Sequence, residues 1–357
     1  MKRSLTVVGL WALIGLVWLC AGCKTPTIPA EHSHGWVVGG SAGGYGTILH
    51  TTDYGATWVR QGDSTVIPAV ALQGISADDD EHVWASGQPA DSFGTILYTS
   101  NGGTTWVRQG DSSTIPDAAF LGVSAADAHT VWVAGSSGAI LKTTNGGTTW
   151  FRQAQGVLPT AIFQSVYAFD RNVVWVVGQD SGGNGAPIIL HTTDGGGTWT
   201  RQGQERLPAK GYFIDVHAAR PPTAWAVGTE MGFRTTDGGE HWVSKAPSAG
   251  IGHVNGVCVV NEQAVWLAVD YSGAYFTPNA GDTWIKQNTP GRGSFCMNIG
   301  VTATHPDTVW MTTIAVGPGV ILHTVDGGAN WVEQLRTDSA GLGNVGLRRI
   351  TFAGAAR

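Results

Sequence analysis

An aspartate or asparagine recurs seven times in this 357-residue sequence in one short setting, Thr-x-Asp/Asn-x-Gly, closed by a tryptophan. The first copy reads TTDYGATW from Thr51. A carboxylate repeated in this way could coordinate Ca²⁺ or act as a catalytic acid. The seven aligned residues are Asp53, Asn101, Asn145, Asp194, Asp237, Asn279 and Asp326.

The exchange between aspartate and asparagine argues against chemistry at this position. Both side chains offer an oxygen that accepts hydrogen bonds, but they differ by a full charge, which a Ca²⁺ site or a catalytic acid would not tolerate across copies. We therefore predict seven Asx-turns, in which that oxygen accepts hydrogen bonds from backbone N–H groups a few residues on. The turn is predicted to be scaffold, with no metal and no cofactor.

A second tryptophan precedes each turn tryptophan by 17 to 24 residues, in strand-like runs such as TVWVAG at Thr130. The two sets account for 14 of the 16 tryptophans, and the other two lie before residue 20. A large ring at a fixed repeat position indicates packing between repeats. His50, His191 and His323 also share one repeat position, which indicates a structural role.

The period of the repeat predicts the fold. Turn tryptophans follow one another at steps of 42 to 49 residues, with four strand-like runs per step, which is typical of a β-propeller. We predict an all-β fold, a single seven-bladed propeller of four-stranded antiparallel blades over residues 34–357. Three glycine-rich segments are expected to form long loops on one rim: Gly39–Gly46, Gln88–Gly94 and Gln179–Pro187.

The two ends of the chain predict how the ring closes. The mature chain opens on a second-strand motif, GWVVGG at Gly35, with no first strand before it. It ends on GLRRITFAGAA, which matches first strands such as FLGVSA at Phe120. We expect the C-terminal strand to complete the N-terminal blade and so to leave few unpaired strand edges.

Residues 1–23 predict export rather than fold. Lys2 and Arg3 precede an apolar run that is too short to be a convincing membrane span, and the run ends in LCAGC. This pattern resembles a bacterial lipoprotein signal, in which Cys23 is lipidated and becomes the mature N-terminus. Plain signal cleavage or a retained anchor is the alternative. Residues 24–33 are expected to form a polar tether.

The charge and the cysteines of the mature chain restrict its partners. After Cys23 there are 18 basic and 26 acidic residues, a net charge of −8, and no basic tract. This composition argues against a nucleic-acid partner. Cys258 and Cys296 lie in adjacent repeats at positions that do not align. Export permits a disulfide between them, and two separately buried thiols are the other reading.

The repeated turn resembles the Asp-box of the BNR repeat, Thr-x-Asp-x-Gly-x-Thr-Trp, which occurs in sialidases and xyloglucan-active glycosidases. Blades that read ILHTTD and GGxTW after a V-W-x-V-G strand look most like the photosystem II stability/assembly-factor-like family, over essentially the whole mature chain. The resemblance implies an exported seven-bladed propeller, with lipoprotein members in cyanobacteria. It also implies a membrane-protein client that is met through an arginine patch.

Two sets of residues are candidates for contact with a partner or ligand. The members of one set each lie two residues after a turn tryptophan: Arg60, Arg108, Arg152 and Arg201. The alternative is that these arginines are solvated charges on strand edges. The other set, Asp215 and Arg349, replaces the glycine or serine of most other innermost strands. We expect both to line the central channel from separate blades, as contacts or as a polar wall that holds water.

We predict a non-catalytic, extracytoplasmic binding or assembly scaffold, lipid-anchored and monomeric. Its partner is expected to be a protein such as a membrane-protein assembly intermediate, at the periplasmic or extracellular face, or in the thylakoid lumen of a photosynthetic host. The alternative is a carbohydrate-active propeller, either a glycosidase or a lectin. The Phe/Tyr-Arg-Ile-Pro segment of sialidases is missing here, and xyloglucanase-like enzymes need facing carboxylates on two propellers.

Overall fold

The computed structural model describes residues 33–157, 160–181, 185–247, 251–290, 296–315 and 317–354, with the backbone alone for residues 296–299 and 314–315. The predicted signal, Cys23 and the tether up to residue 32 lie outside the described residues. The described residues belong to one compact unit. None of them is in a helix, so this part of the chain contains no helix that could cross a membrane.

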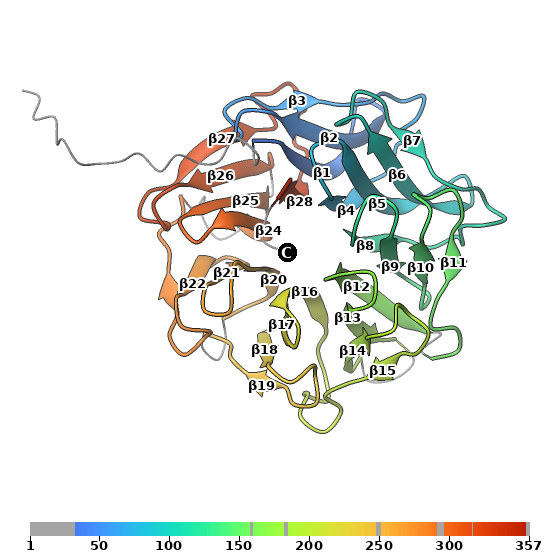
Figure 1. Ribbon diagram of the computed structural model, residues 1–357. Helices are drawn as coiled ribbons and strands as arrows, with labels where there is room; N and C mark the ends of the chain where they lie inside the picture. The colour runs from blue at the N-terminus through green and yellow to red at the C-terminus, as the bar shows by residue number, and fades with distance from the viewer. Residues whose placement is uncertain are drawn as a thin grey trace, which may run out of the picture. The chain divides into compact units, whose positions relative to one another are not determined.

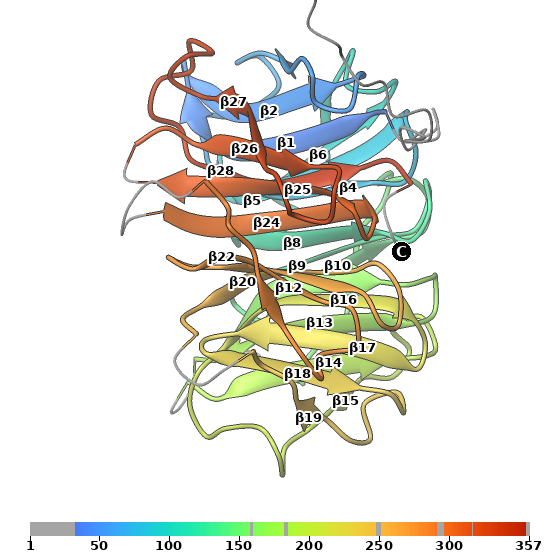
Figure 2. The same cartoon turned by 90° about the vertical axis from the view of Figure 1, so that its left-hand side faces the viewer.

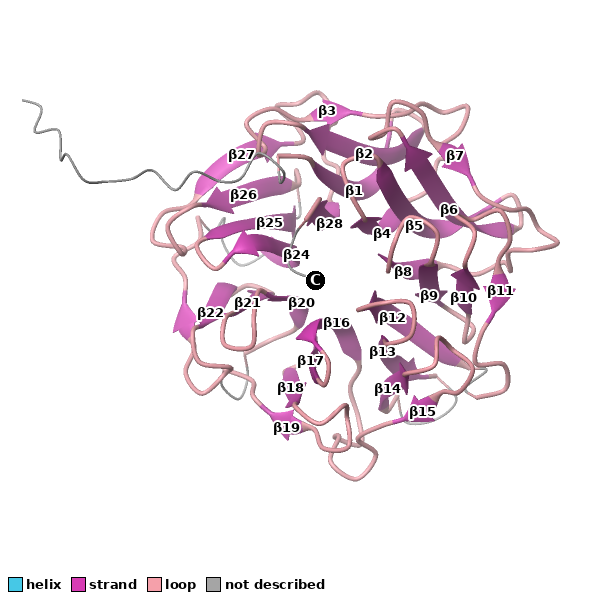
Figure 3. Ribbon diagram, in the orientation of Figure 1, coloured by secondary structure: helices cyan, strands magenta, loops and turns pink. Residues whose placement is uncertain are grey.

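Seven sheets of four antiparallel strands surround a central channel (Figure 1), and strands and loops make up all of the described chain (Figure 3). The predicted seven-bladed propeller is confirmed. Blade 1 contains β1, β2, β3 and β28, and blades 2 to 7 take four successive strands each, from β4–β7 to β24–β27.

The innermost strands line the channel, and the second strands pair with them. The innermost strands are β4 (Leu72–Ala77), β8 (Phe120–Ala125), β12 (Ala161–Ala168), β16 (Phe213–Arg220), β20 (Val254–Val259), β24 (Cys296–His305) and β28 (Leu347–Phe352). The second strands are β1 (Gly35–Ala42), β5 (His82–Ala90), β9 (Val131–Gly135), β13 (Val174–Asp180), β17 (Thr223–Gly228), β21 (Val265–Val269) and β25 (Thr308–Ala315).

The outer half of each blade holds the third strand and a fourth strand, which has two residues in blades 1 to 6 and five in blade 7. The third strands are β2 (Tyr45–Thr51), β6 (Phe93–Ser100), β10 (Ile140–Thr143), β14 (Pro187–Thr192), β18 (Met231–Thr235), β22 (Gly273–Thr277) and β26 (Val320–Thr324). The fourth strands are β3 (Val59–Arg60), β7 (Val107–Arg108), β11 (Phe151–Arg152), β15 (Thr200–Arg201), β19 (Val243–Ser244), β23 (Ile285–Lys286) and β27 (Val332–Arg336).

The hydrophobic core is divided among the blade interfaces. Seven buried clusters are present in the described residues, and each draws its side chains from two neighbouring blades. Five of the interfaces share one contact, in which the second-strand tryptophan of a blade meets the turn tryptophan of the next blade edge to face. Their ring centroids are 5.6 to 6.1 Å apart and their planes cross at 81° to 89°, a favourable geometry for aromatic pairs.

The C-terminal strand closes the ring as predicted. Strand β28 pairs antiparallel with β1, with Gly35 opposite Phe352, and in a side view it lies beside the strands of blade 7 (Figure 2). Phe352 stacks on Trp310 of blade 7 at 3.9 Å between centroids and meets Trp58 of blade 1 edge to face at 6.2 Å. At this interface a phenylalanine therefore contacts both tryptophans, whereas the equivalent tryptophans contact each other directly at five other interfaces.

A second stacking contact repeats inside the blades. In six blades the third-strand residue opposite the buried tryptophan contacts its ring, as His191 does on Trp175 with centroids 3.7 Å apart. His50 and His323 occupy the same position on Trp36 and Trp310, and Phe276 occupies it in blade 6. The three histidines are structural, and burial lowers the pKa of each from 6.5 to about 4.

Two of the three expected long loops are hairpins instead. Strands β1 and β2 continue to a two-residue turn at Gly43–Gly44, and β5 and β6 to a turn at Asp91–Ser92. All four turn residues have positive φ, between 52° and 89°, as a tight hairpin turn requires. Gly43 and Gly44 thus form the turn, and Gly39 allows close approach to the backbone of Gly346. Residues 182–184 of the third segment lie outside the described residues.

Replacing Phe352 with alanine tests the closure. Phe352 is 1% exposed, so the variant Phe352→Ala should lose about 3–5 kcal/mol of unfolding free energy. The matched control is Phe151→Ala, at a side chain that is 57% exposed, which should change stability by less than about 0.5 kcal/mol. Urea denaturation measures both variants. Equal midpoints for the two variants would show that β28 is not packed between blades 1 and 7.

The stacked histidines predict a loss of stability in mild acid. Each has a pKa near 4 in the folded ring and 6.5 as its ordinary value, so the unfolded chain binds more protons between these values. Stability should be fully present above pH 6.5 and should fall as the pH drops towards 4. Thermal melts across this range measure the effect. His191→Phe, which places at this position the residue type that blade 6 has in Phe276, should reduce the slope of melting temperature against pH. An unchanged slope would contradict the role of the buried histidines.

Candidate functional site

Each repeated turn is a closed set of hydrogen bonds. In blade 4 the Thr192 hydroxyl donates to Asp194 Oδ1 at 2.8 Å and accepts the Gly196 N–H at 2.9 Å. Asp194 accepts the Thr198 N–H at 2.9 Å and the Thr198 hydroxyl at 2.8 Å. The backbone N–H of Thr198 is the main cause that lowers the pKa of Asp194 to about 2. The carboxylate is thus occupied as an acceptor within its own turn.

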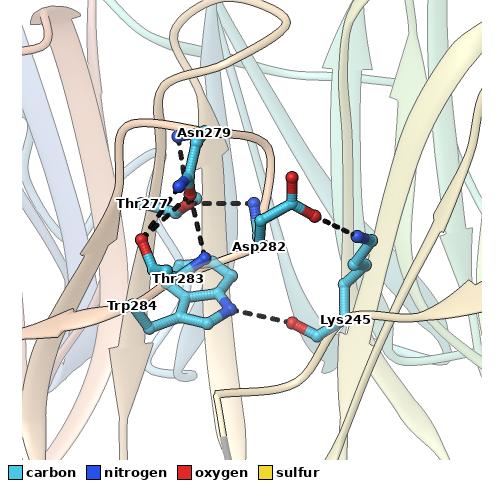
Figure 4. A network of polar contacts seen from close by, with 7 residues as sticks. Lys245, Thr277, Asn279, Asp282, Thr283 and Trp284 are labelled. Atoms are coloured by element: carbon cyan, nitrogen blue, oxygen red, sulfur yellow. Dashed lines mark hydrogen bonds and ion pairs between the residues drawn. The ribbon is translucent and has the colours of Figure 1, made fainter.

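The asparagine copies preserve this network because threonine can reverse one hydrogen bond. In blade 6, Asn279 Oδ1 accepts the Thr283 N–H at 2.9 Å, and Asn279 Nδ2 donates to the Thr283 hydroxyl at 2.9 Å (Figure 4). A hydroxyl both donates and accepts, so it serves a carboxylate or an amide equally well. The physical reason for the Asp/Asn exchange is therefore this hydroxyl.

One turn offers three groups that could hold a metal ion. Asp237, Glu240 and His241 of blade 5 are exposed, and their ligand atoms lie within 4.8 Å of one another. His241 stands at the position of the usual threonine, and its Nδ1 lies 2.7 Å from Asp237 Oδ2. The turn itself accounts for this contact, so it does not indicate a metal site.

The turns also connect neighbouring blades. A glutamine three residues after the turn tryptophan donates to a carbonyl of the next turn in three blades: Gln61 Nε2 to Gly102 at 2.8 Å, Gln202 Nε2 to Gly238 at 2.8 Å and Gln334 Nε2 to Tyr54 at 3.0 Å. In blade 6, Trp284 Nε1 donates to the Lys245 carbonyl of blade 5 at 2.9 Å (Figure 4). Because strand direction alternates, these turns lie on the face opposite the turns between second and third strands.

The four arginines of the outer strands have different surroundings. The Arg60 guanidinium lies 3.6 Å from the centre of the Tyr45 ring and donates to the Tyr45 carbonyl at 3.1 Å. Arg108 lies over Phe93 in the same way and forms an ion pair with Asp91 at 2.7 Å. These two arginines brace the long hairpins of blades 1 and 2. Arg152 is exposed and Arg201 is half-buried.

Asp215 and Arg349 meet each other across the channel. Arg349 Nη1 donates to Asp215 Oδ2 at 2.8 Å, from blade 1 to blade 5. Asp215 also accepts the Ser165 hydroxyl of blade 4 at 2.8 Å and the Val257 N–H of blade 6 at 3.0 Å. Asp215 is 8% exposed as a residue, so its carboxylate is a buried anion satisfied by three donors. The sequence singled out both residues but did not reveal that they pair.

A β-bulge interrupts the pairing of each innermost strand with its second strand. In β4 the bulge falls between Leu72 and Gly74, and the same shift recurs in all seven blades. Bulges re-aim side chains. In the six blades whose bulge side chain is described, they direct one further residue to the channel wall at the mouth: Gln73, Leu121, Gln164, Ile214, Asn255 and Arg348.

These residues surround a cavity of about 440 Å³ at one mouth of the channel. Gln179, from the end of a second strand, and Tyr212, just before β16, place the mouth on the face opposite the Asp-box turns. The described lining residues are Gln73, Leu121, Gln164, Gln179, Tyr212, Ile214, Asn255, Arg348 and Arg349. None of these is aspartate or glutamate. Two cations and several neutral hydrogen-bonding groups suit binding better than acid–base catalysis.

Arg348 is the residue that the sequence analysis missed. Strict strand alternation would direct it away from the channel if Arg349 faces inward, and only the bulge brings both to the wall. The doubled arginine in GLRRITF was the available signal. Of the two cysteines, Cys258 is a buried free thiol whose pKa burial raises to about 12. The side chain of Cys296 lies outside the described residues.

Comparison with known proteins settles the family. The sequence profile described as photosynthesis system II assembly factor YCF48 matches residues 27–166 and 114–315, which is more than half of the chain. The chain belongs to the YCF48 family. A search of curated protein sequences found no match.

Solved structures agree with this fold. A YCF48 bound to a D1 peptide and the YCF48 from Cyanidioschyzon merolae both align with a TM-score of 0.56 and 21% identity over 73% of this chain, and over 81% and 84% of their own. The xyloglucanase from Xanthomonas campestris aligns with a TM-score of 0.54 and 13% identity, over 85% of this chain and 59% of its own. At these identities the likeness shows the propeller fold alone.

Substitutions at Asp194 test the scaffold role of the turn. Asp194→Asn should leave the melting temperature nearly unchanged, because the Thr198 hydroxyl can accept from an amide. Asp194→Ala should lower it, because the Thr198 N–H and the Thr192 hydroxyl lose their acceptor. A chelator should have no effect on either variant or on the parent. A large drop in melting temperature with chelator would revive the Ca²⁺ interpretation.

Proposed function

We propose that this protein is a non-catalytic, extracytoplasmic assembly scaffold that holds a segment of a protein partner at the channel mouth. One observation carries the proposal: the cavity at the mouth combines arginines, amides and a tyrosine hydroxyl, without a carboxylate among its described lining residues. Such a set can hold a polar chain segment by hydrogen bonds and charge but lacks an acid–base pair.

Family membership supports a protein as the partner. The chain matches the assembly-factor profile over most of its length, and one YCF48 structure was solved with a D1 peptide. Partner recognition by this chain is accordingly proposed to involve a membrane-protein assembly intermediate. The outer arginines Arg152 and Arg201 remain candidate contacts at the rim, and Arg60 and Arg108 would act there through the hairpins that they brace.

The alternative is a carbohydrate-active propeller, and glycosidase propellers are distant structural matches of the chain. Most glycoside hydrolases use two carboxyl groups that flank the scissile bond. The described wall of the channel mouth offers none. Asp215, deeper in the channel, is engaged by Arg349, Ser165 and Val257. The geometry therefore favours binding over hydrolysis.

Capture from solubilised host membranes tests the proposal. The tagged full chain should retain a membrane protein, and a panel of glycans should remain uncleaved. Gln179→Glu, which places a carboxylate at the mouth, should abolish capture. The matched control is Gln263→Glu on the opposite face, at an exposed turn between β20 and β21, and it should capture normally. Turnover of any glycan, or equal capture by Gln179→Glu, would contradict the proposal.

The membrane anchor is a separate part of the proposal. Lipidation at Cys23 would hold the propeller at the membrane where its partner is assembled. In Cys23→Ala the protein should move from the membrane fraction to the soluble fraction, because a second anchor is not part of the proposed arrangement. Immunoblots of the two fractions measure this. A variant that stays on the membrane to the same extent as the parent would show that Cys23 is not the anchor.

A further inference from the structure

The channel mouth holds a cation that has no counter-ion among the described residues. Arg348 lines the cavity, and its Nε is buried without a hydrogen-bond partner. No described carboxylate forms an ion pair with its guanidinium, whereas the neighbouring Arg349 is bound to Asp215. Burial lowers the pKa of Arg348, yet a guanidinium keeps its proton at neutral pH. The positive charge is therefore present and partly desolvated.

The charge of the described lining residues, together with Asp215, comes to one positive unit. Arg348 and Arg349 each contribute one, and Asp215 compensates Arg349. The remaining polar lining of the mouth is neutral, with three glutamine amides from blades 2 and 4, Asn255 and the Tyr212 hydroxyl. A partly buried charge costs free energy unless it is paired. An anionic ligand with a single charge would supply the missing partner.

We propose that the channel mouth binds a carboxylate group, with Arg348 as its counter-ion. This inference rests on the proposed function, since it names the chemistry that the same site recognises. Arg–carboxylate pairs are strong and directional because the planar guanidinium presents parallel N–H donors to two oxygens. A phosphate dianion would call for a second free cation, and Asp215 removes that possibility by engaging Arg349. The glutamine amides are placed to contact the atoms that carry the carboxylate.

The carboxylate has two possible sources, a free organic acid or the C-terminus of a peptide chain. Isothermal titration of the full chain with propionate, with acetyl-trialanine and with acetyl-trialanine amide separates them. The free-acid peptide should bind and its amide should not if the source is a peptide end. Propionate alone should bind if the source is a free acid. Either pattern supports carboxylate recognition, and inorganic phosphate should bind more weakly than the carboxylate probe.

Variants of Arg348 connect the binding to the residue. Arg348→Gln should lower the affinity for the carboxylate probe by about tenfold or more, because the carboxylate loses a charged hydrogen-bond partner. Arg348→Lys should restore part of this affinity. The matched control is Arg171→Gln, an exposed arginine on the opposite face that pairs with Asp127. It should bind like the parent. Melting temperatures of all variants show that they are folded.

Three results would overturn the inference: no saturable binding of either carboxylate probe at millimolar concentration, saturable binding of the peptide acid and its amide with equal affinity, or equal affinity of the parent and Arg348→Gln for the carboxylate probe. Failure of the scaffold proposal looks different. If carboxylate binds but no membrane protein is captured, the carboxylate site stands and the scaffold function fails. If a membrane protein is captured but neither carboxylate probe binds, the scaffold stands and this inference fails.

Discussion

Packing between neighbouring blades is the constraint on which the rest of the structure depends. The second-strand tryptophans are at most 1% exposed. Six of the seven contact an aromatic ring of the next blade, and six contact a third-strand side chain of their own blade. A four-stranded sheet that is apolar on both faces cannot bury both alone, so it needs a neighbour on each side. A ring is the arrangement that gives every blade two neighbours. The last interface depends on Phe352, and the position of β28 follows from it.

The candidate site is a consequence of that closure. Strand β28 carries two consecutive arginines into a channel whose other innermost strands hold mainly glycine, serine or neutral side chains. Small residues such as Gly122, where an added Cβ would lie 2.9 Å from the Val166 nitrogen, let neighbouring strands approach and leave room for long side chains elsewhere. The small residues at the repeated positions thus form the channel wall, and the residues that depart from the repeat, Arg348 and Arg349, provide the groups for binding.

Regular spacing made the fold predictable. The tryptophan period gave the blade number, the unmatched ends gave the closure, and the Asp/Asn exchange gave the role of the turn. The site was predictable only in part. Asp215 and Arg349 differ visibly from the aligned glycines, but their pairing depends on a distance across the channel that no sequence pattern encodes. Arg348 was missed because one bulge shifts the alternation of β28, and the long hairpins were missed because glycines suit turns and loops alike.

The central claim is that β28 is an integral innermost strand and thereby holds Arg348 and Arg349 in the channel. Native-state hydrogen exchange of the amides in Leu347–Phe352 tests this claim directly, because local stability sets their protection. The account predicts protection equal to that of β4 (Leu72–Ala77), the innermost strand of the next blade, since β28 pairs with β1 in the same way that β4 pairs with β5. Exchange at the rate of exposed turn amides such as Ser92 would contradict it.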